Sequence, residues 1–248
     1  MNILPVIILG VPRSGTTLLR VLLDSHPDIL GAPETAWVTG GYGDFSLRQL
    51  IDSMVNDELG AVENMSGINK DVIIKASQKF LNEIFGTYLQ ESGKKILVLK
   101  TPDDIRYLCL LDNLFPEARY IHIHRDGRDV ACSTRAQKGK FFGDDALKEY
   151  GDLTTINALH RWVDWENQVN DFLASGHKKK ITISYENLIQ NSSDILKEIC
   201  KFVGVSFDGS MIDYTRTKHD LPSWEAGSCD VVSNRTISSK SIGRWKEE

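Results

Sequence analysis

The sequence has few of the features that mark small cross-linked, membrane-spanning or fibrous proteins. It has only four cysteines, and none form a Cys-x-x-Cys pair, so neither a disulfide framework nor a zinc ribbon is indicated. The early apolar run at residues 5–9 is far shorter than the ~20 residues that cross a bilayer, and no basic segment precedes it as in an export signal. We therefore expect a cytoplasmic protein.

A large excess of one charge is also lacking. Lysine and arginine total 29 against 34 aspartates and glutamates, a formal charge of -5. This balance argues against nucleic acid as a partner but leaves room for a local basic pocket. The 41% of hydrophobic and 25% of charged residues are ordinary, which excludes collagen, coiled coil and wholesale disorder. With no repeat and no shift in composition, residues 1–248 are expected to form a single domain.

Short apolar runs alternate with longer stretches of helical periodicity. The runs are continuously apolar, as in strands buried on both faces of a parallel sheet, and lie at 6–9, 96–99, 120–123 and 181–183. Helices are predicted at about 16–25, 70–91, 104–115, 128–138, 154–175 and 193–203. The alternation predicts an α/β fold in three layers, with a central parallel sheet flanked by helices. We expect 35–70 and 205–240 to be loops and short helices over the carboxyl edge of the sheet, where ligands bind in such folds.

A glycine-containing loop at residues 10–18 joins the first predicted strand to the first helix. This arrangement aims backbone N–H groups and a helix N-terminus at phosphate. The spacing imitates the Walker motif, but Thr16 stands in place of its lysine, which weakens a kinase interpretation. An ordinary strand-to-helix turn is the alternative. The predicted anion-binding residues are Arg13, Ser14, Gly15, Thr16 and Thr17.

A second candidate anion site follows the predicted strand at 119–123. Arg125 lies at the carboxyl end of that strand, and Ser133 lies one to two turns into the next helix. The two side chains could hold a second phosphate together. The alternative is that the charged residues at 125–129 pair with one another at a helix start, because surface ion pairs are common.

Two anion sites on one sheet edge suit a ligand with phosphates at both ends. The pair resembles the signatures of the sulfotransferases that depend on 3′-phosphoadenosine 5′-phosphosulfate (PAPS). Residues 12–17 resemble that family's loop for the 5′-phosphosulfate, and Arg125 with Ser133 resembles its 3′-phosphate signature. The resemblance runs from residue 6 to 245, with a gap at about 36–95. It is closest to the branch of tyrosylprotein and many bacterial sulfotransferases, in the segments 10–18, 24–28 and 34–35.

The resemblance implies transfer of a sulfuryl group to a hydroxyl, release of adenosine 3′,5′-bisphosphate (PAP), and no metal. Glu34 matches the glutamate taken as the base in the tyrosylprotein branch. In the cytosolic branch a histidine two residues after a strand-end lysine is the base, but here Pro102 follows Lys100 at that distance. Lys100 would then stabilise charge on the bridging oxygen, and Arg13 would orient the sulfuryl group.

Other assignments come from the same resemblance. Tyr185 matches a tyrosine near the nucleotide, although a packed tyrosine at a strand end is the alternative. Arg244 matches a basic residue that reaches the phosphate end of PAPS, and the chain stops soon after it, which allows for a C-terminal truncation. Leu18 replaces a tryptophan that stacks on adenine in the cytosolic branch, so another aromatic would have to serve.

The acceptor cannot be read from the sequence. A small-molecule, carbohydrate, lipid or peptidyl hydroxyl is compatible with it. A P-loop kinase and a nucleotide-binding module without chemistry are the competing functions. The histidines show no metal-ligand spacing, so none is predicted to bind metal. The aromatic residues in loops that could face the acceptor are Trp37, Tyr42, Phe45, Phe141 and Phe142.

Overall fold

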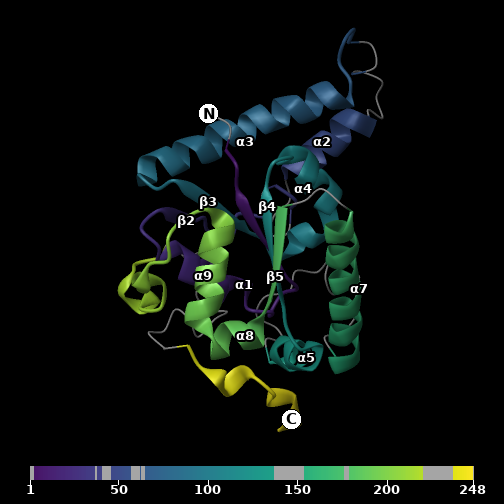
Figure 1. Ribbon diagram of the computed structural model, residues 1–248. Coiled ribbons are helices and arrows are strands. Elements are labelled where there is room, and N and C mark those ends of the chain that lie inside the picture. Colours follow the sequence, from purple (N-terminus) through teal and green to yellow (C-terminus); the bar gives the residue numbers. More distant parts are fainter. Residues whose placement is uncertain are drawn as a thin grey trace.

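The centre of the molecule is a five-stranded parallel sheet with the order β2-β3-β1-β4-β5 (Figure 1). The computed structural model describes residues 3–36, 38–40, 46–56, 62, 65–136, 154–175, 179–219 and 237–247. The strands are β1 (Val6–Leu9), β2 (Ile29–Gly31), β3 (Ile96–Lys100), β4 (Arg119–His124) and β5 (Lys179–Ser184). The predicted parallel α/β fold is confirmed. The sequence analysis missed β2, because three residues are too few to form a visible apolar run.

Helices cover both faces of the sheet. They are α1 (Thr16–Asp24), α2 (Leu47–Asn56), α3 (Lys70–Ser92), α4 (Leu108–Leu114), α5 (Gly127–Arg135), α7 (Thr155–Ala174), α8 (Tyr185–Gln190) and α9 (Ser192–Val203). Short 3₁₀ segments complete the described chain: η1 (Pro102–Tyr107), η2 (Gly209–Met211), η3 (Tyr214–Arg216), η5 (Ser239–Ser241) and η6 (Arg244–Lys246). None of the helices in the described part of the chain is long and apolar enough to cross a membrane.

The sheet has a hydrophobic core on each face, which explains why a central strand such as β1 is apolar at every position. Val6 and Ile8 of β1 face a core built with α1, α8 and α9, whereas Ile7 and Leu9 face a core built with α3, α4 and α7. Successive side chains of a strand point to opposite faces. A strand covered on both faces therefore needs apolar residues at every position, which is the pattern that predicted the sheet.

The helix predicted at 104–115 is only partly correct. The chain forms η1 first and begins α4 at Leu108. Pro102 occupies the start of η1 and has no amide hydrogen to donate. Tyr107, the last residue of η1 and the N-cap of α4, has φ -135° and ψ 34°, outside the helical range. The periodicity of 104–115 therefore spans two short helical segments, and the first of them directly follows Lys100.

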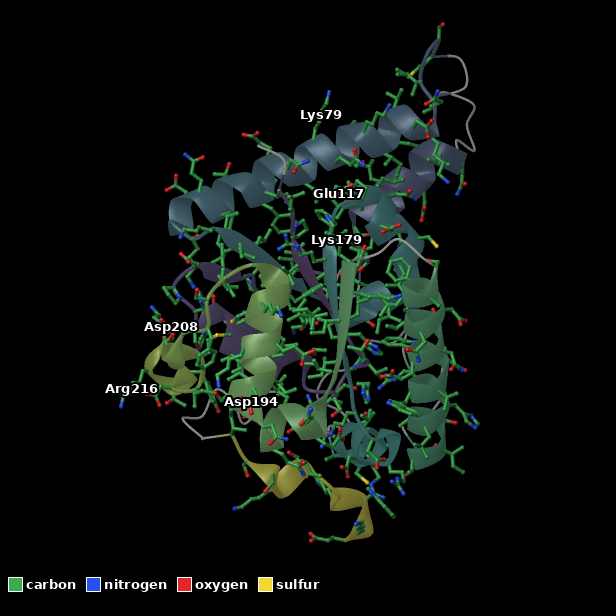
Figure 2. The ribbon with its side chains drawn as sticks, viewed as in Figure 1. Lys79, Glu117, Lys179, Asp194, Asp208 and Arg216 are labelled. Carbon is green, nitrogen blue, oxygen red and sulfur yellow. The ribbon has the colours of Figure 1, made fainter. Side chains whose placement is uncertain are left out.

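Figure 2 shows charged side chains around the outside of the molecule. Lys179, at the amino end of β5, lies 3.7 Å from Glu117, which precedes β4, and both are well exposed. The carboxyl ends of the strands differ, because Glu34, Lys100, Asp104, Arg125 and Asp129 are all buried there. Burying a charge costs free energy unless the charge is paired, so the buried charged groups at this edge need polar partners.

Candidate active site at the carboxyl edge of the sheet

The loop between β1 and α1 has the conformation that an anion site needs. Arg13 and Gly15 both adopt left-handed backbone angles, with φ 76° and 97°. A Cβ on Gly15 would lie 2.4 Å from the Tyr185 ring, so only glycine fits there. Gly15 caps α1 without any side-chain hydrogen bond, which leaves the first amides of the helix for a ligand. The buried Ser14 hydroxyl also has no hydrogen-bond partner among the described residues.

The two predicted anion sites meet directly. Arg13 Nε donates to Ser133 Oγ at 3.1 Å, and Arg125 Nη1 donates to the Arg13 carbonyl at 2.9 Å. The Arg125 guanidinium lies over the Tyr185 ring, 4.3 Å from its centroid. The buried Arg125 Nε has no hydrogen-bond partner among the described residues and remains able to donate. The structure therefore brings Arg13, Arg125, Ser133 and Tyr185 into one cluster.

The C-terminal segment closes this cluster beneath α5 and α8 (Figure 1). The buried Asp129 carboxylate accepts hydrogen bonds from the amides of Gly243, at 2.7 Å, and Trp245, at 3.1 Å. Arg128 stacks on the Trp245 ring at 3.7 Å. Arg244 lies between the two held residues and is thus carried to this edge of the sheet.

Contacts with Ser241 add to this closure. Tyr185 Oη lies 2.8 Å from Ser241 Oγ, and Arg125 Nη2 donates to the Ser241 carbonyl. The ion-pair alternative for residues 125–129 holds only for Arg128, which bonds Asp126 at 2.6 Å. Asp129 and Arg125 bind the C-terminal segment instead. The sequence analysis did not identify this role of Asp129 and Ser241, because their partners lie more than 50 residues away.

Lys100 joins the loop to Glu34. Its Nζ donates to Glu34 Oε2 and to Thr17 Oγ1, the latter at 3.3 Å. Lys100 is 2% exposed and Glu34 is 5% exposed, so the pair is screened from water. Thr17 belongs to the first turn of α1, next to the buried Thr16. A cation, a carboxylate and the helical end of the anion loop therefore lie together, which brings Lys100, Glu34 and Thr17 into one cluster.

Glu34 owes its place to the same helix that carries the loop. Arg20 of α1 donates to the Gly31 carbonyl at 2.9 Å, and Asp24 accepts the Gly31 amide at 2.9 Å. A Cβ on Gly31 would lie 2.8 Å from Asp24 Cβ, so this close approach of β2 and α1 requires glycine. Glu34 follows three residues later. The geometry of the loop and the position of Glu34 are thus coupled through α1.

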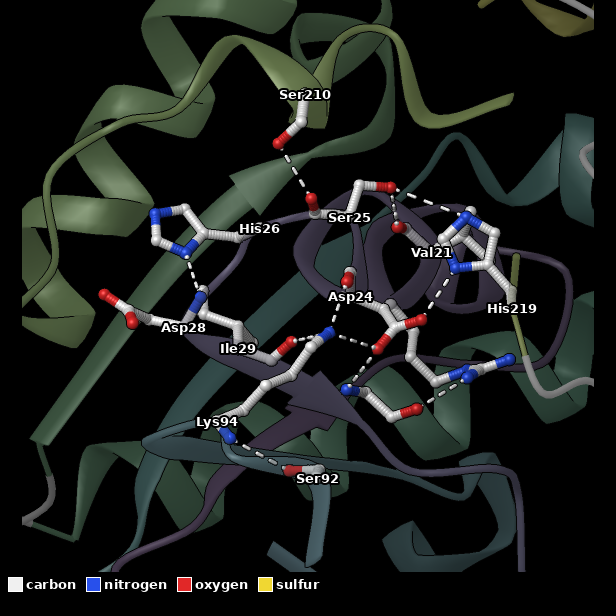
Figure 3. A network of polar contacts seen from close by, with 12 residues as sticks. Val21, Asp24, Ser25, His26, Asp28, Ile29, Ser92, Lys94, Ser210 and His219 are labelled. Carbon is white, nitrogen blue, oxygen red and sulfur yellow. Dashed lines mark hydrogen bonds and ion pairs between the residues drawn. The ribbon is translucent and has the colours of Figure 1, made fainter. Parts of the chain in front are cut away.

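A network around Asp24 secures this coupling (Figure 3). Lys94 Nζ donates to the carbonyls of Asp24 and Ile29 at 2.8 and 2.7 Å, and it pairs with Asp24 Oδ1 at 3.3 Å. His219 Nδ1 lies 2.7 Å from Asp24 Oδ2. Burial opposes ionisation of Asp24, but the hydrogen bonds from His219 and Gly31 and the charge of Lys94 outweigh it and lower its pKa.

Ser25, His219 and Asp24 lie in the order of a hydrolytic triad, but their contacts do not suit that chemistry. His219 Nε2 is 3.0 Å from the Tyr214 carbonyl and 3.5 Å from Ser25 Oγ. The Ser25 hydroxyl donates to the Val21 carbonyl at 2.9 Å. Both ring nitrogens of His219 therefore face acceptor oxygens, and neither is placed to take a proton from Ser25. The network holds the segment around 214–219 against the end of α1.

A second buried carboxyl, which the sequence analysis missed, lies near Lys100. Asp104 of η1 accepts a 2.7 Å hydrogen bond from the Thr39 hydroxyl, and both residues are buried. Burial raises the pKa of Asp104 to about 7. The Thr39 hydrogen bond and Lys100 oppose this rise, whereas the charges of Asp103 and Glu34 add to it. The acidic pair at 103–104, directly after a strand-end lysine and Pro102, was the available signal.

Other predictions fall outside the catalytic cluster or outside the described residues. Leu18 packs in the core with α9. Trp162 packs against Gly127, where a Cβ would lie 2.6 Å from its ring, in keeping with a core position. His122 is buried 3.1 Å from Glu166. The aromatic residues expected to face the acceptor lie outside the described part of the chain: Trp37, Tyr42, Phe45, Phe141 and Phe142.

Comparison with known proteins shows the family to which this chain belongs. Residues 5–209 match the model of the sulfotransferase family, so the chain belongs to that family. The chain is similar to protein-tyrosine sulfotransferase 2 of Gallus gallus, with 27% identity over 83% of this chain and 52% of that protein. It is also 25% identical to the nodulation protein NoeE of Sinorhizobium fredii (strain NBRC 101917 / NGR234), over 97% of this chain and 59% of NoeE. The chain thus spans a little over half the length of these relatives.

Solved structures agree on the fold. The sulfotransferase domain from the curacin biosynthetic pathway superposes with a TM-score of 0.69, at 20% identity over 99% of this chain and 92% of that domain. The sulfotransferase domain of the Synechococcus PCC 7002 olefin synthase gives a TM-score of 0.65, at 22% identity over 100% and 89%. At this level of identity the likeness concerns the fold.

Proposed function

We propose that the protein transfers the sulfuryl group of PAPS to a hydroxyl acceptor and releases PAP. The observation that carries this proposal is the contact of the buried Lys100 with both the buried Glu34 and the half-buried Thr17. It puts a carboxylate, a cation and the anion loop at one point of the sheet edge. Membership of the sulfotransferase family supports the same reaction.

The donor set of the cluster fits a nucleotide with two phosphate-bearing ends. Ser14 Oγ and the free amides at the start of α1 suit the 5′-phosphosulfate. The 3′-phosphate would be bound by Arg125 and Ser133, because guanidinium groups form strong paired hydrogen bonds to phosphate. Arg244 lies in the segment that packs at the same edge. Arg13 contacts Ser133 and so stands between the two ends. PAPS would enter as a co-substrate and supply the activated sulfuryl group.

In the proposed reaction the acceptor oxygen attacks sulfur while the bond from sulfur to the bridging oxygen of PAP breaks. Glu34 takes the proton of the acceptor hydroxyl, which is general base catalysis. Lys100 offsets the negative charge that grows on the bridging oxygen, and Arg13 offsets charge on the sulfuryl oxygens. The burial of Lys100 and Glu34 strengthens their interactions because the local dielectric constant is low.

The acceptor class in this proposal is a hydroxyl on a small molecule, carbohydrate, lipid or peptide. The Gallus gallus relative is named for protein tyrosine, and NoeE is named for nodulation. Two such different names within one family agree with the general rule that substrate sites vary on a shared fold.

Thermal unfolding with PAP, with ATP and Mg²⁺, and with neither tests the nucleotide assignment. A ligand at a hundred times its Kd stabilises the folded state by about 2.7 kcal/mol. We expect PAP alone to raise Tm, and Arg125→Ala to remove the effect. Arg216→Ala is the matched control, because Arg216 is 83% exposed and lies in η3 (Figure 2). Stabilisation by ATP and Mg²⁺ but not by PAP would overturn the proposal in favour of a kinase.

Turnover is the second part of the test. Incubation with PAPS and a panel of hydroxyl acceptors should release PAP, detected by chromatography, and should give a sulfated product by mass spectrometry. Binding of PAP without any product across phenols, sugars and lipids would indicate a nucleotide-binding module instead.

A further inference from the structure

We propose that Asp104 is a positioning residue for the transfer reaction, holding the segment that carries Glu34 and offsetting the pull of Lys100 on that carboxylate. The inference rests on the proposed function, because it assigns Asp104 a role toward Glu34 as the base. Neither the family resemblance nor the motifs of the sequence analysis point to Asp104.

Asp104 is hydrogen-bonded to two separate segments of the site. The Asp104 amide donates to the Thr101 carbonyl at 3.0 Å, which fixes the residue one turn beyond Lys100. Thr39 reaches its carboxyl from the other side, at 2.7 Å. One side chain therefore ties the end of β3, which carries Lys100, to the segment after β2, which carries Glu34.

The segment after β2 needs such a tie because its backbone is irregular. It leaves the sheet after Ala32, whose amide donates to the Val98 carbonyl at 2.9 Å. Ala36 has a positive φ of 52°, a conformation that is strained for a non-glycine residue. Arg48 donates to the Thr39 carbonyl at 3.0 Å and lies over the Tyr107 ring of η1 at 4.6 Å. The Thr39–Asp104 bond is the buried link in this set.

The charge of Asp104 also interacts with the charges of Lys100 and Glu34. The positive charge of Lys100 beside Glu34 opposes the transfer of a proton to that carboxylate. A second carboxylate in the same buried cluster favours proton uptake by Glu34, because like charges repel in a low dielectric. Asp104 is 6% exposed, so water screens this effect little. Its charge therefore counts where the acceptor proton must be received.

The protonation of Asp104 gives this role a pH dependence. Its pKa is raised to about 7, chiefly by burial, so it carries a charge above that pH and is neutral below it. Asp103, Glu34 and Lys100 are the charged groups that act on it directly. On the helices packed against η1, the buried ionisable side chains are Arg161 and Glu166 of α7, and Asp112 of α4 is half-buried. The other ionisable residues of these helices are exposed: His160, Asp164 and Asp171 of α7 and Cys109 of α4. Deprotonation of Asp104 near pH 7 should speed the transfer.

The test is the pH profile of kcat/KM with PAPS and a simple phenol whose hydroxyl, like that of tyrosine, ionises near pH 10. The wild-type rate should rise through an inflection near pH 7. Asp104→Asn should remove this inflection and lower the rate above pH 7 by roughly tenfold, the equivalent of one pKa unit. Hydrolysis of PAPS, with water as acceptor, gives the same comparison for a different acceptor.

Two neighbouring substitutions should move the inflection in opposite directions. Thr39→Val removes a hydrogen bond that favours the charged form of Asp104, so the inflection should move to higher pH. Asp103→Asn removes a repelling charge, so it should move to lower pH. Opposite shifts support the proposal even if Asp104→Asn folds poorly. An unmoved inflection in both variants, or an unchanged profile in Asp104→Asn, would overturn it.

Stability separates this role from a merely structural one. Because the pKa of Asp104 is raised in the folded state, its favourable contribution is complete below pH about 4 and is lost as pH rises through about 7. Asp104→Asn should therefore raise Tm at pH 8, by at least ~2 °C, while it slows the reaction. A lower Tm together with a lower rate would indicate a structural residue and overturn the proposal. Absence of PAP binding in the wild-type protein would instead overturn the proposed function, whatever the role of Asp104.

Discussion

Two buried aspartates respond to burial in opposite ways. Asp24, at the end of α1, receives the Gly31 amide, His219 and Lys94, and its pKa is lowered although burial opposes ionisation. Asp104, in η1, receives the Thr39 hydroxyl, and burial raises its pKa to about 7. Burial alone therefore does not decide the state of a carboxyl group. The donors that the fold supplies decide it.

The two surroundings suit different tasks. Around Asp24 the charges and hydrogen-bond donors are matched, and the network joins α1, β2 and the segment at 214–219 (Figure 3). Near Asp104, Lys100 is paired with Glu34, and the charges of both residues act on Asp104. An unevenly matched buried cluster costs stability and can change its protonation near neutral pH, which is a frequent property of functional sites. The substitutions that follow test this difference between the surroundings of Asp24 and Asp104.

The largest expected effect is on activity. Glu34→Gln keeps the volume of the side chain but removes the base, so the rate of sulfuryl transfer should fall by about 10²–10⁴-fold. The Tm shift with PAP should persist, because Glu34 is not among the residues assigned to the nucleotide. Steady-state kinetics and thermal unfolding check the two statements. A variant with nearly normal turnover would remove Glu34 from the role of base.

The next effect is on stability, at the other aspartate. Asp24→Asn leaves Lys94 and His219 without their carboxylate, and removing one member of a buried charged set costs about 3–5 kcal/mol. Urea unfolding at pH 7 measures this loss. Asp28→Asn is the matched control, because Asp28 pairs with an exposed Lys95 at 3.0 Å and such pairs contribute about 0–1 kcal/mol. Equal losses in both variants would contradict the matched character of the Asp24 network.

A smaller effect concerns pH. The pKa of Asp24 is lowered below 3.8 in the folded state, so its contribution to stability is complete above pH about 4 and fades as pH falls further. The difference in Tm between the wild type and Asp24→Asn should therefore narrow between pH 5 and pH 3, on the order of a few degrees. Calorimetry across this range checks it. A difference that stays constant would mean that His219 and Lys94 do not depend on the charge of Asp24.

The smallest effect is expected far from both aspartates. Lys179→Ala breaks the 3.7 Å pair with Glu117, whose members are 62% and 69% exposed. Stability should change by less than about 0.5 kcal/mol, and activity should not change, because the pair lies at the amino ends of the strands. Urea unfolding and the PAPS assay together set this baseline. A larger loss of stability would mean that removing any charged residue lowers the free energy of unfolding. The difference between Asp24 and Asp104 could then not be attributed to their surroundings.

Sequence patterns predicted well the elements that repeat one rule over several residues. The four longer strands stood out because each contains a short, largely apolar run, and α3, α7 and α9 because their periodicity extends over at least 12 residues. The three-residue β2 and the six-residue α8 were missed, since neither is long enough to show a period. At 104–115 the sequence shows one period where the backbone forms two segments.

The candidate site divides in the same manner. Arg13, Ser14 and Thr17 follow one strand and lie within five residues, so their grouping is visible without a structure. Glu34 carried no local signal, and only the family resemblance singled it out. Asp104 had neither, because its significance comes from a hydroxyl 65 residues earlier in the chain.

By itself, the sequence determined the buried parallel sheet and the anion loop, since strand burial and a strand-loop-helix turn depend on neighbouring residues. Only the tertiary structure decided that Lys100 meets Glu34 and Thr17, that Arg125 and Ser133 meet Arg13, and that Asp104 meets Thr39. These contacts join segments that are distant in sequence. The state of a buried carboxyl depends on which donors surround it, and that is settled only when β2, β3 and α1 pack together.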